Sequence, residues 1–281
     1  MPLRDIKILP GIVTVPTDRS AAGRWKSGDK VRFTQGQPEK LGGWQKASTN
    51  LITGICRGVA DFITLLMVKW IAAGTHLKLY VYTSGTFSDI TPVRATTNPM
   101  ANNPFSMTDG SAVVTVTDNA HGALDGDYVT FSGAAAGGGI TISGEYQLTY
   151  VGTNSYTITH SAAATSTTTG GGAAVVAAYQ INVGTVDTVY GLGFGIGTFG
   201  SGTWGTARTL STFLFRCRTW KLDAWGEDLI ACPRGGGVYV WDSSTGIGTR
   251  ATAVTNAPVT AKGIFVFPDI RILVAYGAYT G

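Results

Sequence analysis

The chain has 281 residues, a formal net charge of +4, three cysteines and 39 glycines, and only 14% of its residues are charged, against about a quarter in an average globular protein. Few charges with many turn formers and β-branched residues favour short β-strands. The longest apolar run, 62–73, is too short for a membrane span and contains Lys69, and the N-terminus has no apolar signal core, so we expect neither membrane insertion nor secretory export.

The charges are unevenly distributed along the chain. Residues 1–50 have a net charge of +5, whereas residues 91–180 have a net charge of −4. A basic front and an acidic middle predict different surroundings for the two segments. The cysteines are odd in number and widely spaced, so we expect reduced thiols in the core of a protein made in the cytosol.

The first domain is predicted over residues 1–50 as an extended basic arm followed by a β-hairpin. Residues 1–20 show no periodicity and contain three prolines, which is typical of an arm that orders only against a neighbour. A Ser-Gly-Asp turn at 27–29 precedes a strand that alternates, with Val31 and Phe33 on the inner face. The chain turns at 35–38 and returns towards Trp44.

Aromatic and basic side chains in this domain are candidate contacts with other molecules, because aromatic residues dominate interface hot spots and phosphates need only positive charge. The candidates for docking to a neighbouring subunit are Trp25, Lys26, Lys30, Arg32 and Trp44. The candidates for lining a DNA channel are Lys7 and Arg24. We favour protein docking, since each neutralised phosphate adds affinity and hinders sliding DNA. Solvated strand faces, and tryptophans that cover the hairpin's own core, remain alternatives.

A repeat organises the rest of the chain. In residues 70–84 and again in 229–243, an Ile-Ala pair is followed, nine positions after the Ile, by Tyr-Val-aromatic. A third copy begins at Ile272. A hairpin used this often predicts a radially repeated all-β body, here a partial β-propeller. Its first part is expected over 51–97, with strands near 58–64, 65–73 and 77–83, and its second part over 181–281, stopping within a unit.

Residues 98–180 are predicted to form a separate small β-barrel or sandwich, inserted into the repeated body. The composition shifts to Thr, Ala, Gly and Val, and the repeat lies on both sides. Four strands are predicted, at 113–117, 128–131, 145–151 and 155–159, with turns at 125–127, 137–139 and 152–154.

No motif in the chain indicates catalysis or a cofactor. Asp125-Gly126-Asp127 fits a hairpin turn better than a carboxylate pair or a calcium site, which needs six or more oxygen ligands. The Gly-rich segment 195–200 matches a dinucleotide fingerprint formally, but no strand and helix flank it. His76, His121 and His160 are isolated, so we expect no metal site, no cofactor and no enzyme activity.

Several motifs in this order resemble a phage structural protein. They are Gly-Asp-Lys-Val-Arg-Phe at 28–33 with Pro-Glu-Lys-Leu-Gly-Gly-Trp at 38–44, then 219–231 around Thr-Trp-Lys-Leu-Asp-Ala-Trp, then Arg-Gly-Gly-Gly-Val-Tyr-Val-Trp-Asp at 234–242. Together they resemble the β-propeller tail hub, or nozzle, of short-tailed phages, the packaged-DNA stabilisation group. The segment 121–131, with Gly144-Glu145-Tyr146, resembles a β module found in phage tail and baseplate proteins.

The resemblance implies a structural virion protein of the phage tail, synthesised in the cytoplasm of the host bacterium. It implies a ring of identical subunits, six being the expected number, below the portal and its adaptor, which retains and conducts the genome. Implied partners are portal and adaptor proteins, tail needle or fibre proteins, and phage DNA through non-specific contact.

Two other functions remain open from the sequence. The inserted module could bind host glycans as an adsorption protein, with Tyr128, Tyr146, Tyr150 and Tyr156 as stacking surfaces. The protein could also be a cell-wall hydrolase, which predicts an activity that Glu145→Gln abolishes; we expect no such activity.

Overall fold

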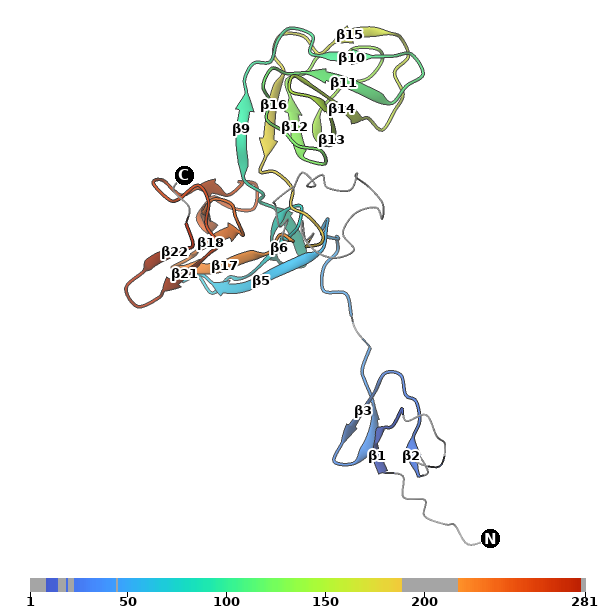
Figure 1. Cartoon of the computed structure of the whole chain (residues 1–281), viewed down its shortest axis with the longest axis vertical. Coiled ribbons are helices and arrows are strands. Elements are labelled where there is room, and N and C mark those ends of the chain that lie inside the picture. The colour runs from blue at the N-terminus through green and yellow to red at the C-terminus, as the bar shows by residue number, and fades with distance from the viewer. Residues whose placement is uncertain (1–8, 15–18, 20–22, 44, 189–216, 279–281) are drawn as a thin grey trace, which may run out of the picture. The chain divides into compact units, whose positions relative to one another are not determined.

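The computed structural model describes residues 9–14, 19, 23–43, 45–188 and 217–278 (Figure 1). The chain divides into two compact units, 1–47 and 48–281, each of which is described by itself. In the described residues the regular structure is β-sheet, with one short 3₁₀ turn, η1 (Ser243–Thr245), and no helix long and apolar enough to cross a membrane. The prediction of an all-β fold is confirmed.

The N-terminal unit contains two pairs of short strands. β1 (Leu9–Ile12) runs parallel to β2 (Arg24–Trp25), and β3 (Val31–Thr34) forms an antiparallel hairpin with β4 (Gln37–Lys40). Val31 and Phe33 are half-buried while Arg32 is exposed, as the alternation predicts. The returning strand starts at Gln37, inside the segment predicted as a turn, because Gln35 and Gly36 alone reverse the chain with positive φ angles.

The large unit contains two four-stranded antiparallel meanders and a third strand pair. The first sheet consists of β5 (Cys56–Ile63), β6 (Lys69–Thr75), β7 (Leu79–Thr83) and β8 (Thr86–Asp89). The second sheet consists of β17 (Trp220–Trp225), β18 (Asp228–Pro233), β19 (Tyr239–Trp241) and β20 (Thr252–Ala253). The third sheet consists of β21 (Gly263–Phe267) and β22 (Ile272–Tyr276).

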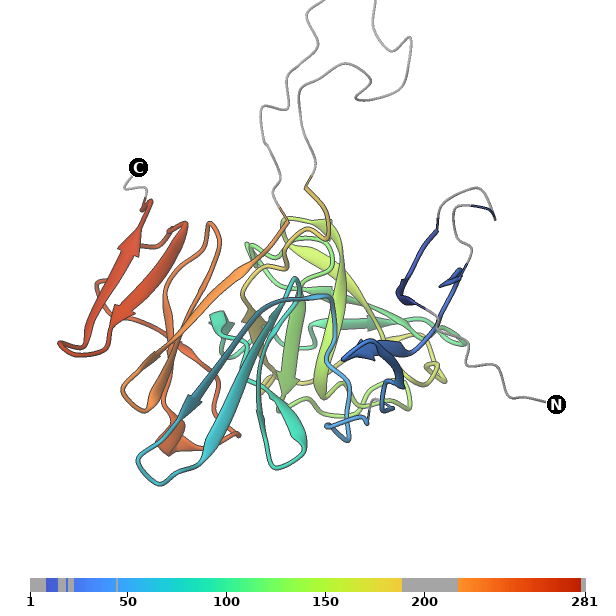
Figure 2. The same ribbon diagram turned by 90° about the horizontal axis from the view of Figure 1, so that it is seen from below.

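These three sheets are stacked in chain order, with β17 in contact with both β5 and β21 (Figures 1 and 2). One apolar cluster fills the space between the first and second sheets, where Trp70 and Trp241 meet edge to face at 5.0 Å. Another lies between the second and third sheets around Ile230 and Ile264. Each sheet therefore buries one face by packing on the next, which is how repeated units of this kind gain stability.

The repeat places Tyr80 and Tyr239 at the same point of the third strand in their sheets. Val81 and Val240, which follow them, each pack towards the next sheet of the stack. The second strands, however, are shifted by one residue, because Val81 pairs with Ala72 whereas Val240 pairs with Ile230. The longer connection after Cys232 accommodates this shift, which turns the Ile-Ala pair to opposite faces of the two sheets.

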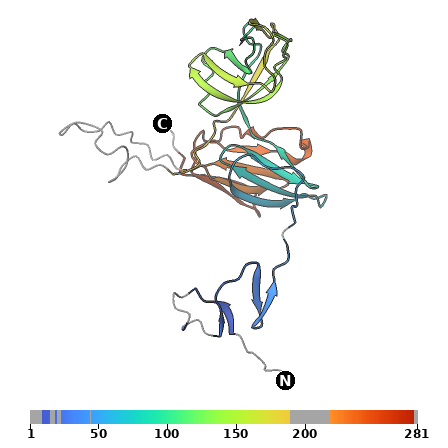
Figure 3. The same ribbon diagram turned by 90° about the vertical axis from the view of Figure 1, so that its right-hand side faces the viewer.

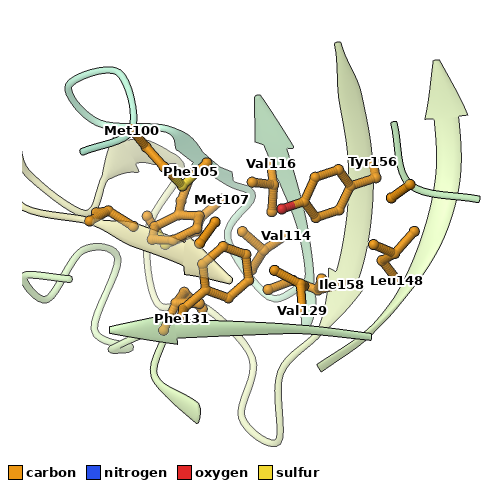
Figure 4. Close-up of a cluster of buried hydrophobic side chains, with 14 of the residues drawn as sticks. Met100, Phe105, Met107, Val114, Val116, Val129, Phe131, Leu148, Tyr156 and Ile158 are labelled. Atoms are coloured by element: carbon orange, nitrogen blue, oxygen red, sulfur yellow. The ribbon is translucent and has the colours of Figure 1, made fainter. Parts of the chain in front are cut away.

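An eight-stranded sheet forms the inserted module, in the order β15-β10-β11-β14-β13-β12-β16-β9. The sheet curls (Figure 3) around a single core, drawn in close-up in Figure 4, in which Phe105 and Phe131 lie edge to face with ring centroids 5.2 Å apart. The strands are β9 (Val93–Thr97), β10 (Phe105–Met107), β11 (Val113–Thr117), β12 (Tyr128–Ser132), β13 (Gly144–Gly152), β14 (Ser155–Thr159), β15 (Thr168–Gly170) and β16 (Val176–Gln180). The sheet takes β9 from before the boundary predicted at residue 98, because β9 pairs with β16.

The cysteines only partly match the expectation of core thiols. All three are free. Cys232 is buried between the second and third sheets, and burial raises the pKa of its thiol to about 11. Cys217 is half-buried and Cys56 is exposed, so the expectation of a core position is wrong for Cys56.

We expect Gly74→Ala to destabilise the protein, because a Cβ on Gly74 would lie 2.3 Å from two atoms of the Trp220 indole. The indole cannot retreat easily, since its Nε1 donates a 2.7 Å hydrogen bond to the carbonyl of Thr75. Overpacking of this kind costs roughly 2 kcal/mol of unfolding free energy. Urea unfolding measures this loss, with Gly248→Ala as the control because open space surrounds Gly248. Equal stability of the two variants would contradict the close packing of the first and second sheets.

Candidate functional site

Four charged side chains meet where the first sheet, the eight-stranded sheet and the loop after η1 come together. Lys78 lies before β7, Asp89 ends β8, Glu145 is on β13 and Arg250 follows η1. The Lys78 ammonium is 2.9 Å from Asp89 Oδ2 and also bonds Glu145. Arg250 lies 3.4 Å from Asp89 and 3.3 Å from Glu145. We call these four residues the charged junction.

Burial strengthens the electrostatic interactions within the charged junction. The side chain of Lys78 is only 5% exposed. Burial alone would lower the pKa of Lys78, but the carboxylates of Asp89 and Glu145 outweigh it and raise the pKa above its ordinary value. Burial likewise favours a higher pKa for Asp89, but Arg250 and Lys78 outweigh it and the pKa is lowered. The charges of Lys78 and Asp89 therefore depend on their partners to offset the cost of burial.

Neutral groups complete the contacts of the junction. The Lys78 ammonium lies 4.4 Å from the centre of the Tyr128 ring, a favourable cation–π distance. Gln180 donates a hydrogen bond to Glu145, and Arg250 donates one of 2.9 Å to the carbonyl of Thr91. The bond from Gln180 adds a third donor to Glu145, besides Lys78 and Arg250.

A polar groove of about 710 Å³ lies beside Glu145 on the eight-stranded sheet. It forms because β13 changes partner: residues 144–147 pair with β12, whereas residues 148–152 pair with β14. The end of β14 stays with β11 instead, and the next residue, His160, donates from its backbone N–H to Ala112. Residues 159–161 consequently diverge from the start of β13. The groove is lined by Asp125, Gly126, Ser143, Glu145, Tyr146, Gln147, Leu148, Thr149, Thr159, His160 and Ser161.

Two rings form one side of this groove. The Tyr146 and His160 rings are stacked, with centroids 6.2 Å apart and planes at 27°. The Tyr146 ring also packs 6.0 Å from Phe131 of the core, which fixes it. Of the tyrosines proposed as stacking surfaces, Tyr146 is half-buried at the groove and Tyr150 is exposed at a smaller pocket near His121. Tyr128 and Tyr156 are buried, so the expectation is wrong for them.

Asp125-Gly126-Asp127 forms a turn, as predicted, but not a hairpin turn, because the strands on either side of it, β11 and β12, do not pair with each other. Gly126 has a φ of +83°, and the N–H of Asp127 donates to the carbonyl of Leu124. Asp127 is buried and accepts hydrogen bonds from Asn182 at 2.6 Å and from the N–H of Val183 at 2.8 Å. Over the described residues, no group of three or more His, Cys, Asp or Glu side chains gathers that could hold a metal ion.

The two ends of the sheet stack expose apolar side chains. On the first sheet, Val59, Ile63 and Ile71 are between 38% and 66% exposed, on the face turned away from the second sheet. On the third sheet, the outward residues are Phe265, Phe267, Ile272 and Tyr276, all 40–50% exposed. We call these the first and last end faces. Soluble monomers rarely leave two such faces uncovered.

The docking candidates of the N-terminal unit have varied surroundings. The Trp25 ring lies 6.3 Å from that of Phe33, so it packs on the hairpin itself. Arg32 forms an exposed ion pair with Glu39, with 2.8 Å from Nε to the carboxylate. Lys26 and Lys30 are exposed, as is Arg24 at the start of β2. Lys7, Trp44 and the Gly-rich segment 195–200 lie outside the described residues. Docking and DNA contact by these side chains remain predictions.

The sequence matches no protein-family model, and a search of curated proteins finds no significant match. Among solved structures, the fold is distantly similar to a phage phi92 endosialidase, with a TM-score of 0.27 and 14% identity over 76% of this chain. The chain spans 31% of the length of that protein. The role of the chain therefore has to be argued from its own residues.

We expect Lys78→Met to cost about 3 kcal/mol of unfolding free energy, because it removes the buried ammonium that pairs with two carboxylates. The exposed Lys69 on β6 provides the matched control, Lys69→Met, which should change stability little. Adding Glu145→Gln to Lys78→Met should recover part of the loss. Denaturant unfolding measures all three, and a Lys78→Met loss no larger than that of Lys69→Met would refute the role of the junction.

The charged junction should also make stability depend on pH. The folded-state pKa of Asp89 is lowered, so its contribution is complete above its ordinary value of 3.8 and disappears as the pH falls through the folded-state pKa. The pKa of Lys78 is raised, so its contribution is complete below 10.5 and disappears as the pH rises through the folded-state pKa. Urea unfolding should therefore show the difference between wild type and Asp89→Asn shrinking below pH 3.8. A difference that stays constant down to pH 2 would contradict this.

Proposed function

We propose that the protein is a non-enzymatic structural subunit of a phage tail, of the hub or nozzle class, in which identical subunits form a ring that retains and conducts the genome. The observation that carries the proposal is the pair of apolar end faces on the sheet stack. The motifs at 28–44 and 219–242, which resemble this group of phage proteins, support the same role.

Each end face is the kind of sheet side that packs against a neighbouring sheet inside the stack. In the second sheet, Leu229 and Ala231 face the previous sheet and Ile230 faces the next. In the first and second sheets, one side packs on the sheet that follows in the stack. The equivalent side of the third sheet carries Phe265 and Tyr276 and is exposed. In the second and third sheets, the other side packs on the sheet that precedes it. The equivalent side of the first sheet is the first end face. A second copy placed head to tail would therefore continue the stack.

Head-to-tail contacts between identical subunits form rings when the rotation closes. A closed ring leaves no end face in water, and it needs no catalytic group to resist the pressure of packaged DNA. In this proposal the basic N-terminal unit contacts the portal or adaptor through Trp25, Lys26, Lys30, Arg32 and Trp44. Lys7 and Arg24 are placed towards the DNA channel, and needle or fibre proteins bind elsewhere on the ring.

Electron microscopy and light scattering of the purified protein test the assembly. We expect rings, and we expect Phe265→Glu to convert them to monomers, because a carboxylate in an apolar interface must lose its hydration. Val151→Glu is the matched control, since Val151 is exposed on β13 in the inserted module. It should leave the rings intact.

Two results would overturn the proposal. One is a protein that stays strictly monomeric at high concentration; the other is absence of the protein from purified virions by mass spectrometry. Thermal unfolding of Phe265→Glu separates loss of assembly from loss of folding, since Phe265 is 40% exposed in the described structure.

A further inference from the structure

The polar groove on the eight-stranded sheet has no part in the proposed assembly. Its residues belong to β13 and Ser143 before it, to the end of β14 with the two residues that follow, and to the turn at 125–126. The end faces belong to β5, β6, β21 and β22. We propose that this groove binds an uncharged polysaccharide.

The lining of the groove offers the groups that sugars require. Hydroxyl groups come from Ser143, Thr149, Thr159 and Ser161, and an amide from Gln147. These are hydrogen-bond donors and acceptors of the kind that pair with sugar hydroxyls. The stacked rings of Tyr146 and His160 add an aromatic surface for the C–H face of a pyranose.

Charge decides which class of sugar fits. The residues that line the groove include two carboxylates, Asp125 and Glu145, and neither lysine nor arginine. Glu145 is paired with Lys78 and Arg250, so the carboxylates leave at most a weakly negative field. A sialylated or otherwise anionic sugar would meet Asp125 without a cation to bind it. An uncharged chain has no such penalty.

The side chains are held in place before any ligand arrives. Gln147 Nε2 donates to the carbonyl of Gly126 at 3.0 Å, and Asp125 accepts from the N–H of Tyr150 at 2.9 Å. Tyr146 is fixed by Phe131, and Glu145 by the charged junction. A rigid site loses little conformational entropy on binding, which favours affinity for a weak, polar ligand.

An extended peptide that adds to the free edge of β13 is the competing occupant. Peptides bound in this way usually need pockets for alternate side chains. The groove has one aliphatic side chain of any size in its lining, Leu148, and that side chain is buried in the core. The lining, which is polar apart from the rings of Tyr146 and His160, therefore favours sugar over peptide.

The full-length protein should be tested on an array of immobilised glycans that contains uncharged hexose and N-acetylhexosamine oligomers together with polysialic acid. We expect binding to uncharged oligomers and none to polysialic acid. Against the best uncharged oligomer, titration calorimetry should show about tenfold weaker binding for Tyr146→Ala and near wild-type binding for Tyr146→Phe. The control Tyr150→Ala removes an exposed tyrosine of the same strand and should leave affinity unchanged.

A second variant avoids any effect on folding. Ser161→Trp places a large ring in the groove from an exposed position and should abolish binding. Four results would overturn the proposal: no binding to any uncharged glycan, preference for polysialic acid, affinity that Tyr146→Ala and Ser161→Trp leave intact, or capture of extended peptides from a displayed library in place of sugars. Because none of these variants touches an end face, ring assembly reports independently on the proposed function.

Discussion

The ammonium of Lys78 is the contact on which the large unit depends. It lies within a few ångströms of a carboxylate from the first sheet and one from the inserted module, with almost no exposure to water. A lysine in this position is tolerable only while both carboxylates remain, since an unpaired buried charge is far more costly than a solvated one. Arg250 adds a link to the loop after η1. Asp89 and Arg250, which are 161 residues apart in sequence, thus share one electrostatic cluster with Lys78 and Glu145.

Apolar packing and charge have separate roles in this molecule. The stack of sheets is held by tryptophan, leucine and valine side chains, and Trp220 approaches Gly58 and Gly74 so closely that no side chain fits between them. On both sides this packing ends in faces that expose apolar side chains, and the first end face also carries the charged Asp61 and Lys69.

The sequence allowed the local structure to be predicted better than the long-range contacts. The strands at Val113–Thr117 and Ser155–Thr159 were predicted with correct bounds. Along each of them every second residue is buried, and polar turns flank both strands. The repeat correctly predicted that Tyr80 and Tyr239 lie on the returning strands of two equivalent hairpins. It could not give the one-residue shift of the second strands, which depends on how the connection after Cys232 packs.

The candidate site could not be predicted in the same way. Lys78 lies near the start of the strand predicted at 77–83, and nothing in the local pattern indicates that its ammonium bonds Glu145, 67 positions away. The stacking role proposed for Tyr156 failed because alternation says that one face is buried but not which tyrosine lies on it. Tyr156 belongs to the core, with its hydroxyl 2.9 Å from that of Tyr179. The groove itself depends on β13 changing partner, a property of the whole sheet.

Glu145 connects the charged junction with the groove, and this connection bears on the choice between binding and hydrolysis. A glycosidase needs one carboxyl that gives up a proton and a second one across the scissile bond. The partners of Glu145 are Lys78, Arg250 and Gln180, all of which donate to it. The nearest carboxylate in its cluster, that of Asp89, shares the same two cations. Glu145 is thus held by three donors, and Asp125, the second carboxylate of the groove, accepts from the N–H of Tyr150; on this basis we propose binding of sugar and not its hydrolysis.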